Sequence, residues 1–222
     1  MQKNSNDFSC QLRANKFAPT TFTHLNNMNL IEIIEKNFAE NIATKQRTLE
    51  KAKNNIALAA QLMTHSLLSG GKILSCGNGG SAGEAQLFSS KMLNRFQMER
   101  PGLPAIALST DTSVLTSIAN DYSYDQIFSR QVAALGQEPD LLLIITTSGN
   151  SGNIVSAVDT AHERNMKVIA LTGANGGEVS ARLQHDDIEI RVDSDSPIRI
   201  QETHLLIIHC LGDLVDSQLM GA

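Results

Sequence analysis

The spacing of apolar residues changes near residue 72 of the chain. Before it, apolar side chains recur every three or four positions over 30–42 and again over 56–67, which predicts two successive helices, the first with a buried stripe. After it come short apolar runs bounded by glycine or serine, which are too brief for helices. These runs predict five buried parallel strands, at 73–76, 105–108, 141–145, 168–171 and 188–192.

Amphipathic stretches lie between these short runs. The segments 82–96 and 154–164 predict helices between strands, and 198–219 predicts a closing helix. An alternation of strand and helix is typical of an αβα sandwich, in which helices cover both faces of a parallel sheet. We therefore predict an α/β fold of three layers, with a five-stranded parallel sheet and an N-terminal helical pair, forming one domain over 29–222.

Residues 1–28 have a different pattern from the rest of the chain. They are rich in asparagine, serine and threonine, carry three basic residues against one acidic residue, and show no sustained apolar period. This composition predicts a flexible N-terminal extension.

Composition narrows the class of protein. The chain has 222 residues, 41% of them hydrophobic, and a net charge of −5, which favours a folded domain and excludes a chain-wide basic field for direct nucleic acid binding. Its three cysteines show no paired spacing, so neither a disulfide framework nor a zinc knuckle is expected. No apolar run approaches the roughly 20 residues of a membrane span. We expect a cytoplasmic protein without membrane contact.

Two loops carry the pattern of an anion site. CGNGGS at 76–81 follows the first predicted strand, TTSGNS at 146–151 follows the third, and each leads into a helix. Glycines there can turn backbone N–H groups toward a ligand, and hydroxyls add donors at a helix N-terminus. The candidate phosphate-binding residues are Asn78, Gly79, Gly80, Ser81, Thr146, Thr147, Ser148 and Ser151. The alternative is that these residues only cap the helices.

Neither loop has the lysine of a Walker motif, and the first lacks the full G-x-G-x-x-G spacing, so a phosphorylated sugar is favoured over a nucleotide. Asn120 and Asp121, after the second strand, are candidates for hydrogen bonds to sugar hydroxyls. An ordinary Asn-Asp turn explains them equally well.

The chain resembles the sugar isomerase (SIS) family, in the branch that holds phosphoheptose isomerase and the DnaA initiator-associating protein. The resemblance runs from about residue 28 to residue 219. Its most specific segments are CGNGGS at 76–81, RPGLPAIAL at 100–108, IANDYSYDQIFSRQV at 118–132, TTSGNS at 146–151, ALTGANGGE at 170–178 and RIQETHLLIIHCL at 199–211.

The isomerases of this branch interconvert sedoheptulose 7-phosphate and a manno-heptose 7-phosphate with the help of zinc. The resemblance implies metal and acid–base positions on two helices. Gln201 and His209 match the family on the last helix, and Gln201 is also a candidate phosphosugar-binding residue. Leu87 and Lys91 stand where a histidine and a glutamate are expected. Leucine has no ligand atom and a protonated lysine repels a cation, so we expect no metal or other cofactor. Zinc and a catalytic His209 belong to the isomerase interpretation alone.

Other carboxylates do not replace the missing one by position. Glu84 lies two turns before Lys91 on the same helical side, about 10 Å away along the axis. The loss favours the initiator-associating branch, which implies a phosphosugar-binding homotetramer, built on helices over 29–69 and 198–219, that binds DnaA and regulates replication initiation. The alternative is a phosphoheptose isomerase.

Overall fold

The computed structural model describes residues 29–221, and the extension predicted over 1–28 lies outside them. Within the described residues, a boundary between two units falls between residues 39 and 40, inside the first helix. None of the helices among the described residues is both long and apolar enough to span a lipid bilayer.

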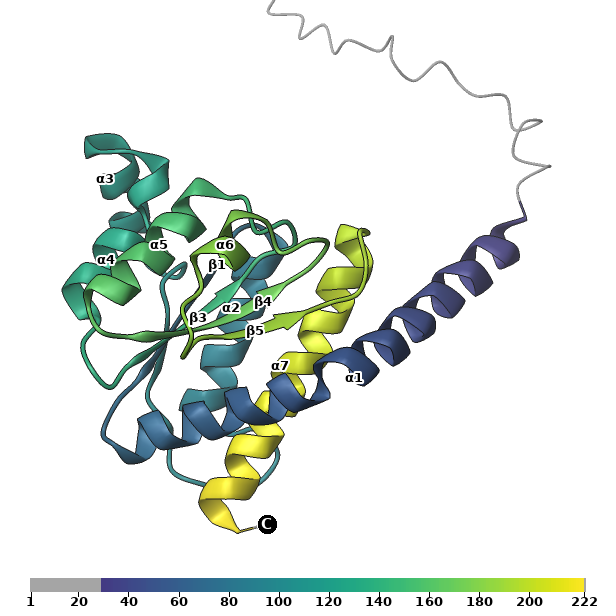
Figure 1. Cartoon of the computed structure of the whole chain (residues 1–222), viewed down its shortest axis with the longest axis horizontal. Coiled ribbons are helices and arrows are strands. Elements are labelled where there is room, and N and C mark those ends of the chain that lie inside the picture. Colours follow the sequence, from purple (N-terminus) through teal and green to yellow (C-terminus); the bar gives the residue numbers. More distant parts are fainter. Residues whose placement is uncertain (1–28, 222) are drawn as a thin grey trace, which may run out of the picture. The chain divides into compact units, whose positions relative to one another are not determined.

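The sheet has five parallel strands, as predicted, and their order is β2-β1-β3-β4-β5 (Figure 1). The strands are β1 (Ile73–Gly77), β2 (Ala105–Ala107), β3 (Leu141–Ile145), β4 (Lys167–Thr172) and β5 (Ile188–Arg191). In register, Ile73 pairs with both Ala105 and Leu141, so β1 and β3 end side by side. The loops that follow these two strands therefore start at the same edge of the sheet.

Helices connect the strands. They are α1 (Leu30–Leu68), α2 (Gly80–Leu93), α3 (Thr112–Asp121), the 3-10 turn η2 (Tyr124–Gln126), α4 (Ser129–Leu135), α5 (Gly152–Glu163), α6 (Gly177–Arg182) and α7 (Pro197–Met220). The N-terminal part is helical as predicted, but α1 is one continuous helix and not a pair. No glycine or proline interrupts 43–55, and the small buried residues Thr44, Thr48 and Ala52 continue the inward face there.

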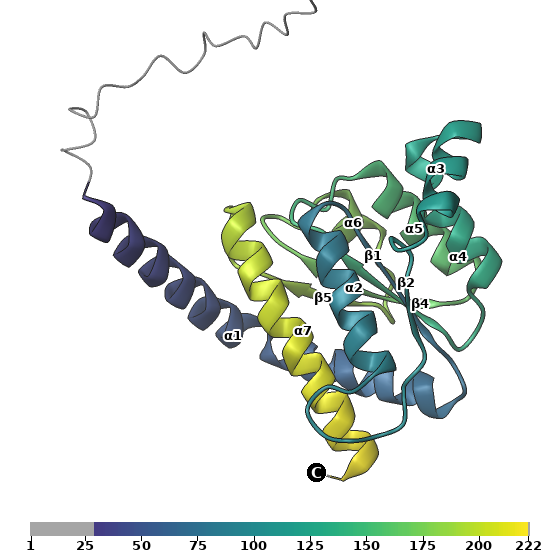
Figure 2. The ribbon, with the colours of Figure 1, turned by 180° about the vertical axis from the view of Figure 1, so that it is seen from behind.

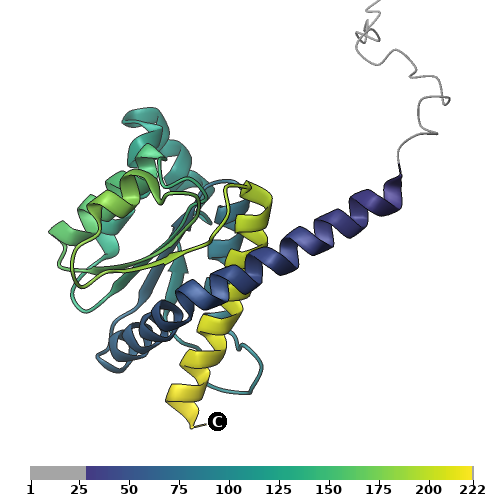
Figure 3. The ribbon, with the colours of Figure 1, turned by 45° about the vertical axis from the view of Figure 1, so that its right-hand side comes forward.

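Two apolar layers enclose the sheet. Along β3, Leu141, Leu143 and Ile145 pack with α2, α7 and the second half of α1, while Leu142 and Ile144 pack on the opposite face with α4 and α5. The same separation is visible in Figures 1 and 2, where α4, α5 and α6 lie on one side of the sheet and α2 and α7 on the other. Figure 3 shows the yellow α7 and the green helices on opposite sides again. A strand buried on both faces needs a continuous apolar run, which is the pattern the sequence shows.

The apolar stripe at the start of α1 is not buried in the described chain, contrary to the prediction. Leu30 and Phe38 are 62% and 68% exposed, and Ile33, Ile34 and Ile42 are exposed as well. A helical period shows which face is apolar but not whether the same chain covers it.

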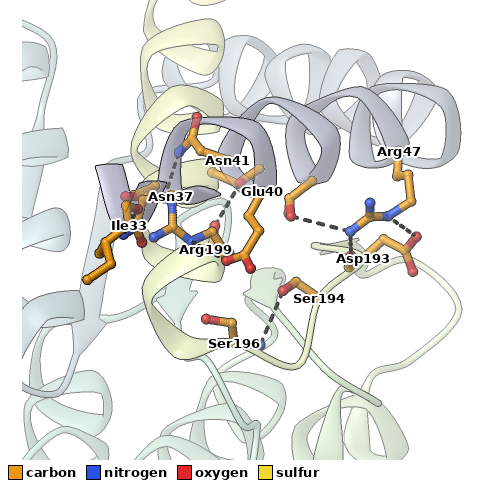
Figure 4. Close-up of polar contacts among 12 residues, drawn as sticks. Ile33, Asn37, Glu40, Asn41, Arg47, Asp193, Ser194, Ser196 and Arg199 are labelled. Carbon is orange, nitrogen blue, oxygen red and sulfur yellow. Dashed lines mark hydrogen bonds and ion pairs between the residues drawn. The ribbon is translucent and has the colours of Figure 1, made fainter. Parts of the chain in front are cut away.

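Polar contacts hold the N-terminal turn of α7 against α1 (Figure 4). Glu202 accepts hydrogen bonds from Asn41 Nδ2 at 2.6 Å and from Arg199 Nη1 at 2.8 Å. Arg47 Nε lies 3.3 Å from Asp193 Oδ2, in the loop before α7. These contacts fix the part of α7 that faces the carboxyl edge of the sheet.

A buried ion pair joins the end of α2 to α7. Arg100 donates from Nε to Asp216 Oδ1 at 2.6 Å, and the two side chains are 0% and 6% exposed. Arg100 also donates to the main-chain oxygens of Lys91, Met92 and Pro101. A buried cation is tolerated only when it is paired and hydrogen-bonded, so this arrangement needs both partners.

We expect Asp216→Ala to lower the free energy of unfolding by about 3–5 kcal/mol, because it leaves the buried Arg100 charge without a counter-ion. The matched control is Asp213→Ala on the same helix, an exposed position where the cost should stay below about 0.5 kcal/mol. Urea unfolding at neutral pH measures both. Equal stability of the two variants would contradict this view of the ion pair.

Candidate functional site

The two glycine- and hydroxyl-rich loops meet around one hollow of about 80 Å³. Its lining residues are Asn78, Ser81, Ile145, Thr146, Thr147, Ser148, Ser151 and Gln201. All of these except Ile145 were predicted from the sequence. They come from the ends of β1 and β3, the starts of α2 and α5, and the first part of α7, so the topology of the sheet brings them together.

A reciprocal pair of amides joins the two loops. Asn78 Nδ2 donates to Asn153 Oδ1 at 2.8 Å, and Asn153 Nδ2 donates back to Asn78 Oδ1 at 2.9 Å. Tyr124 adds a hydrogen bond from its hydroxyl to Asn78 Oδ1 at 3.2 Å. Asn153 was not among the predicted residues. The signal in the sequence was a second asparagine three residues after that of TSGN, at a helix position that is buried in the structure.

Two glycines permit the close approach of the loops. Gly149 has φ +70°, and a Cβ there would collide with the carbonyl oxygen of Gly176. At Gly80 a Cβ would lie 2.6 Å from Gln201 Nε2, so this position brings α2 close to the side chain on α7. Gly80 therefore shapes the hollow without lining it.

The hydroxyl groups differ in what they already do. Thr146 Oγ1 accepts from Gly149 N at 3.2 Å, and Ser148 Oγ accepts from Asn150 N at 3.3 Å, so both support the turn while keeping a proton to donate. Ser151 occupies the N-cap position of α5 but makes no side-chain cap hydrogen bond. The capping explanation thus fails for Ser151, whose hydroxyl lines the hollow.

The positive potential in the hollow comes from helix dipoles and not from cationic side chains. The hollow has no lysine or arginine in its lining, while α2 and α5 both begin beside it, at Gly80 and Gly152. Partial positive charge at a helix N-terminus favours an anion. Together with the hydroxyl donors, this arrangement suits a group with several anionic oxygens, such as a phosphate ester.

Some predicted residues are not brought to the hollow. Asn120 and Asp121 end α3, are exposed, and hydrogen-bond to each other at 3.0 Å. Gly79, with φ +55°, is the N-cap of α2 and does not line the hollow. His209 lies eight residues, or about 12 Å along the axis, beyond Gln201, and its ring lies beside Phe96 with centroids 5.8 Å apart.

The donor set does not fit a metal ion. Leu87 has no ligand atom, and the amine of Lys91 is not among the usual zinc ligands. Among the described residues, no three histidine, cysteine or acidic side chains are grouped so that they could hold a metal. Gln201 and His209 are the donors that remain at the family positions, and they are not enough for the four-ligand site expected of zinc.

Three titratable groups near the carboxyl edge are buried. Burial raises the pKa of Glu84 to about 7, against a lowering effect from a hydrogen bond with Ser81. Burial lowers the pKa of His204 to about 4. Cys76 is fully buried, and burial raises the pKa of its thiol, so this cysteine is not a nucleophile at neutral pH. The sequence indicated no special environment for Glu84 or His204, because burial of a single polar residue leaves no periodic signal.

The SIS domain family model matches residues 37–173 of the chain. The chain belongs to the SIS domain family. Phosphoheptose isomerases of Alkalilimnicola ehrlichii and Shewanella sp. are 59% and 57% identical over 194 and 190 residues. These matches cover 87% and 86% of this chain, and 99% and 96% of the two relatives.

Solved structures show the same SIS fold. The phosphoheptose isomerase of Francisella tularensis has a TM-score of 0.83 at 52% identity, over 86% of this chain and 100% of its own. That of Neisseria gonorrhoeae has a TM-score of 0.80 at 48% identity, over 85% of this chain and 99% of its own. The resemblance seen in the sequence motifs is therefore confirmed at the level of family and fold.

The prediction of a DnaA-binding regulator of replication initiation is wrong. The relatives at 57–59% identity and the solved structures at 48–52% identity are phosphoheptose isomerases. The prediction gave two side chains, Leu87 and Lys91, more weight than the rest of the chain. Those residues stand at the family's metal and acid–base positions, and the loops around the hollow do not depend on them.

We expect Ser151→Ala to weaken binding of sedoheptulose 7-phosphate about tenfold or more, because a hydrogen bond to a charged group contributes about 1.5–3 kcal/mol. Its free energy of unfolding should change little, since Ser151 makes no cap bond. The control is Asp111→Ala, which removes a real cap from α3, where Asp111 Oδ1 accepts from Val114 N at 3.0 Å. That variant should lose about 1 kcal/mol of stability and keep its affinity.

Calorimetric titration and urea unfolding of both variants test the assignment. The assignment is contradicted if Ser151→Ala lowers the free energy of unfolding as much as the loss of a helix cap does but leaves the affinity for the sugar phosphate unchanged. Ser151 would then have a purely structural role.

Proposed function

We propose that this chain is a phosphoheptose isomerase, which interconverts sedoheptulose 7-phosphate and D-glycero-D-manno-heptose 7-phosphate. The convergence of the loops at 78–81 and 146–151 on one hydroxyl-lined hollow carries the proposal. The names of the relatives and of the solved structures support the choice of reaction.

The volumes of two neighbouring hollows suit such a substrate. The hollow of about 80 Å³ is of the size of a phosphate group and is lined by hydroxyls. A second hollow of about 260 Å³ shares Asn78 with it and is lined mainly by apolar groups, including Leu115, Tyr124 and Phe128. A sugar phosphate anchored at Thr146 to Ser151 can bend through the second hollow, so that its reacting carbons return to Ser81 and Gln201 on the α2 and α7 side of the first hollow.

The reaction moves protons between carbons and oxygens. A base must remove a proton from the carbon beside the carbonyl, and donors must hold the oxygens of the ene-diol that forms. Gln201 supplies an amide N–H at the rim of the hollow, and Ser81 supplies a hydroxyl. His209, the acid–base candidate on α7 that the family resemblance implies, does not line this hollow. No cofactor enters the proposal, since the residues at the family's metal positions do not fit zinc.

We place the reaction in the cytoplasm. Cys76 and Cys210 are both free thiols among the described residues, and a reducing compartment keeps them so.

Incubation of the protein with sedoheptulose 7-phosphate, with and without zinc, should produce the aldose. NMR measures the formation of this product. Gln201→Ala should lower kcat/KM about tenfold or more, because one donor to the ene-diol oxygens is lost. Gln218→Ala is the matched control on the same helix, since its amide is exposed and only donates to Leu214 O. Saturable binding of the sugar phosphate without any turnover would overturn the isomerase and leave a sugar-phosphate-binding protein.

The chain is further proposed to form a homotetramer through helices over 29–69 and 198–219. Exposed apolar side chains on α7, among them Ile198 at 62% and Leu206 at 44%, support this assembly. Ile42 and Leu49 on α1 are 54% and 60% exposed. A surface this apolar is favourable only when another surface covers it.

Size-exclusion chromatography with light scattering should give the mass of four chains, and Leu49→Glu with Leu206→Glu should shift it downward. The control is Leu135→Glu on α4, which lies outside the proposed contact and should leave the mass unchanged. Elution of the unaltered protein as a monomer at micromolar concentration would contradict the tetramer.

A further inference from the structure

Two buried polar atoms face each other beside the hollow and have no hydrogen-bond partner among the described residues. They are Glu84 Oε2 on α2 and His204 Nδ1 on α7, 4.0 Å apart. The side chains are 11% and 0% exposed. Buried polar atoms without partners are rare in folded proteins, because each costs free energy, and they call for an explanation.

The other ring nitrogen of His204 determines which atom of the pair can hold a proton. His204 Nε2 lies 2.9 Å from the carbonyl oxygen of Thr172, and a carbonyl only accepts, so Nε2 carries the hydrogen. In the neutral ring, Nδ1 is then a lone pair. A carboxylate facing that lone pair is repelled, whereas a carboxylic acid can donate its O–H to it after a small rotation of the Glu84 side chain.

A proton placed between the two groups is therefore favoured on Glu84 over His204. The direction of both pKa changes agrees, since burial raises the pKa of Glu84 to about 7 and lowers that of His204 to about 4. The groups that face Glu84 are few: Ser81 from its own helix and His204 from α7, with the Thr172 carbonyl of β4 behind the ring. No lysine or arginine is recorded against Glu84 in the described chain.

Ser81 connects this pair to the ligand hollow. Its hydroxyl hydrogen-bonds to the Glu84 carboxylate, and the residue lines the hollow. Gln201, three residues before His204 on α7, lines the same hollow. The pair thus lies one side chain away from a bound ligand, at the end of α2 nearest to it.

We propose that Glu84 takes up and returns the hydroxyl proton of the bound sugar through Ser81, and that neutral His204 accepts a hydrogen bond from the carboxyl group once it is protonated. In one direction the ligand O–H bond breaks as a new Ser81 O–H bond forms, and the original Ser81 proton passes to Glu84. The reverse steps return a proton to the neighbouring ligand oxygen, so the proton balance closes over the interconversion.

This inference rests on the proposed isomerase and names a proton-transfer group for it. Glu84 does not touch the ligand in this scheme and is a positioning residue that acts through Ser81. It is a carboxylate on the same face of α2 as Leu87 and Lys91, which cannot do this work.

The pH dependence of kcat tests the scheme. Only the carboxylate form of Glu84 accepts a proton, so kcat should rise with pH through about 7. Glu84→Gln keeps the shape, and should lower kcat about a hundredfold and remove that rise. Glu84→Asp keeps a carboxyl group, so its kcat should lie between those of Glu84→Gln and the wild type and should again rise with pH. Glu163→Gln, at an exposed position, should leave both rate and profile unchanged.

A second variant guards against simple misfolding. Ser81→Ala keeps both side chains of the Glu84–His204 pair but removes the relay hydroxyl, and should lower kcat to a similar degree with a smaller change in KM. Circular dichroism and urea midpoints confirm that each variant is folded. Wild-type turnover with an unchanged pH profile in Glu84→Gln overturns this inference alone. Absence of wild-type turnover between pH 5 and pH 9 overturns the proposed function, and this inference falls with it.

Discussion

The reciprocal amide pair of Asn78 and Asn153 is the contact on which the site depends. Each side chain donates to the other and accepts from it, at 2.8 and 2.9 Å, so the loop after β1 is joined to the first turn of α5. Two helix N-termini that could point apart are in this way directed at one hollow. Asn153 is 1% exposed, and in that environment a lost amide partner costs more than it does in water.

The fold and most of the hollow could be predicted because parallel-sheet geometry leaves few choices. A run such as Leu141–Ile145 must be buried on both faces, and the carboxyl ends of adjacent strands must share an edge. Hydroxyl-rich loops after two such strands then have to meet. The residues that sequence reasoning missed are those whose role depends on burial: Asn153, Glu84 and His204 look like ordinary polar helix residues until their surroundings are known.

The errors have a common cause. The apolar period failed to show that α1 is continuous because small polar residues, Thr44 and Thr48, occupy its buried face between the two apolar segments. The function was assigned wrongly because a missing pair of side chains was treated as a missing activity. In both cases a conclusion was drawn from the type of a few residues. The outcome depends instead on packing, which brings segments together that are distant in the sequence.

Glu84 shows how the environment decides the chemistry of a residue. The hydrogen bond from Ser81 favours the carboxylate and lowers the pKa of Glu84. Burial acts in the opposite direction and is the larger effect, so the pKa is raised from 4.5 to about 7. The same carboxyl group in water would be ionised throughout the neutral range. Because the resulting pKa lies near neutral pH, a change in the hydrogen bond from Ser81 is enough to alter the fraction of Glu84 that is protonated.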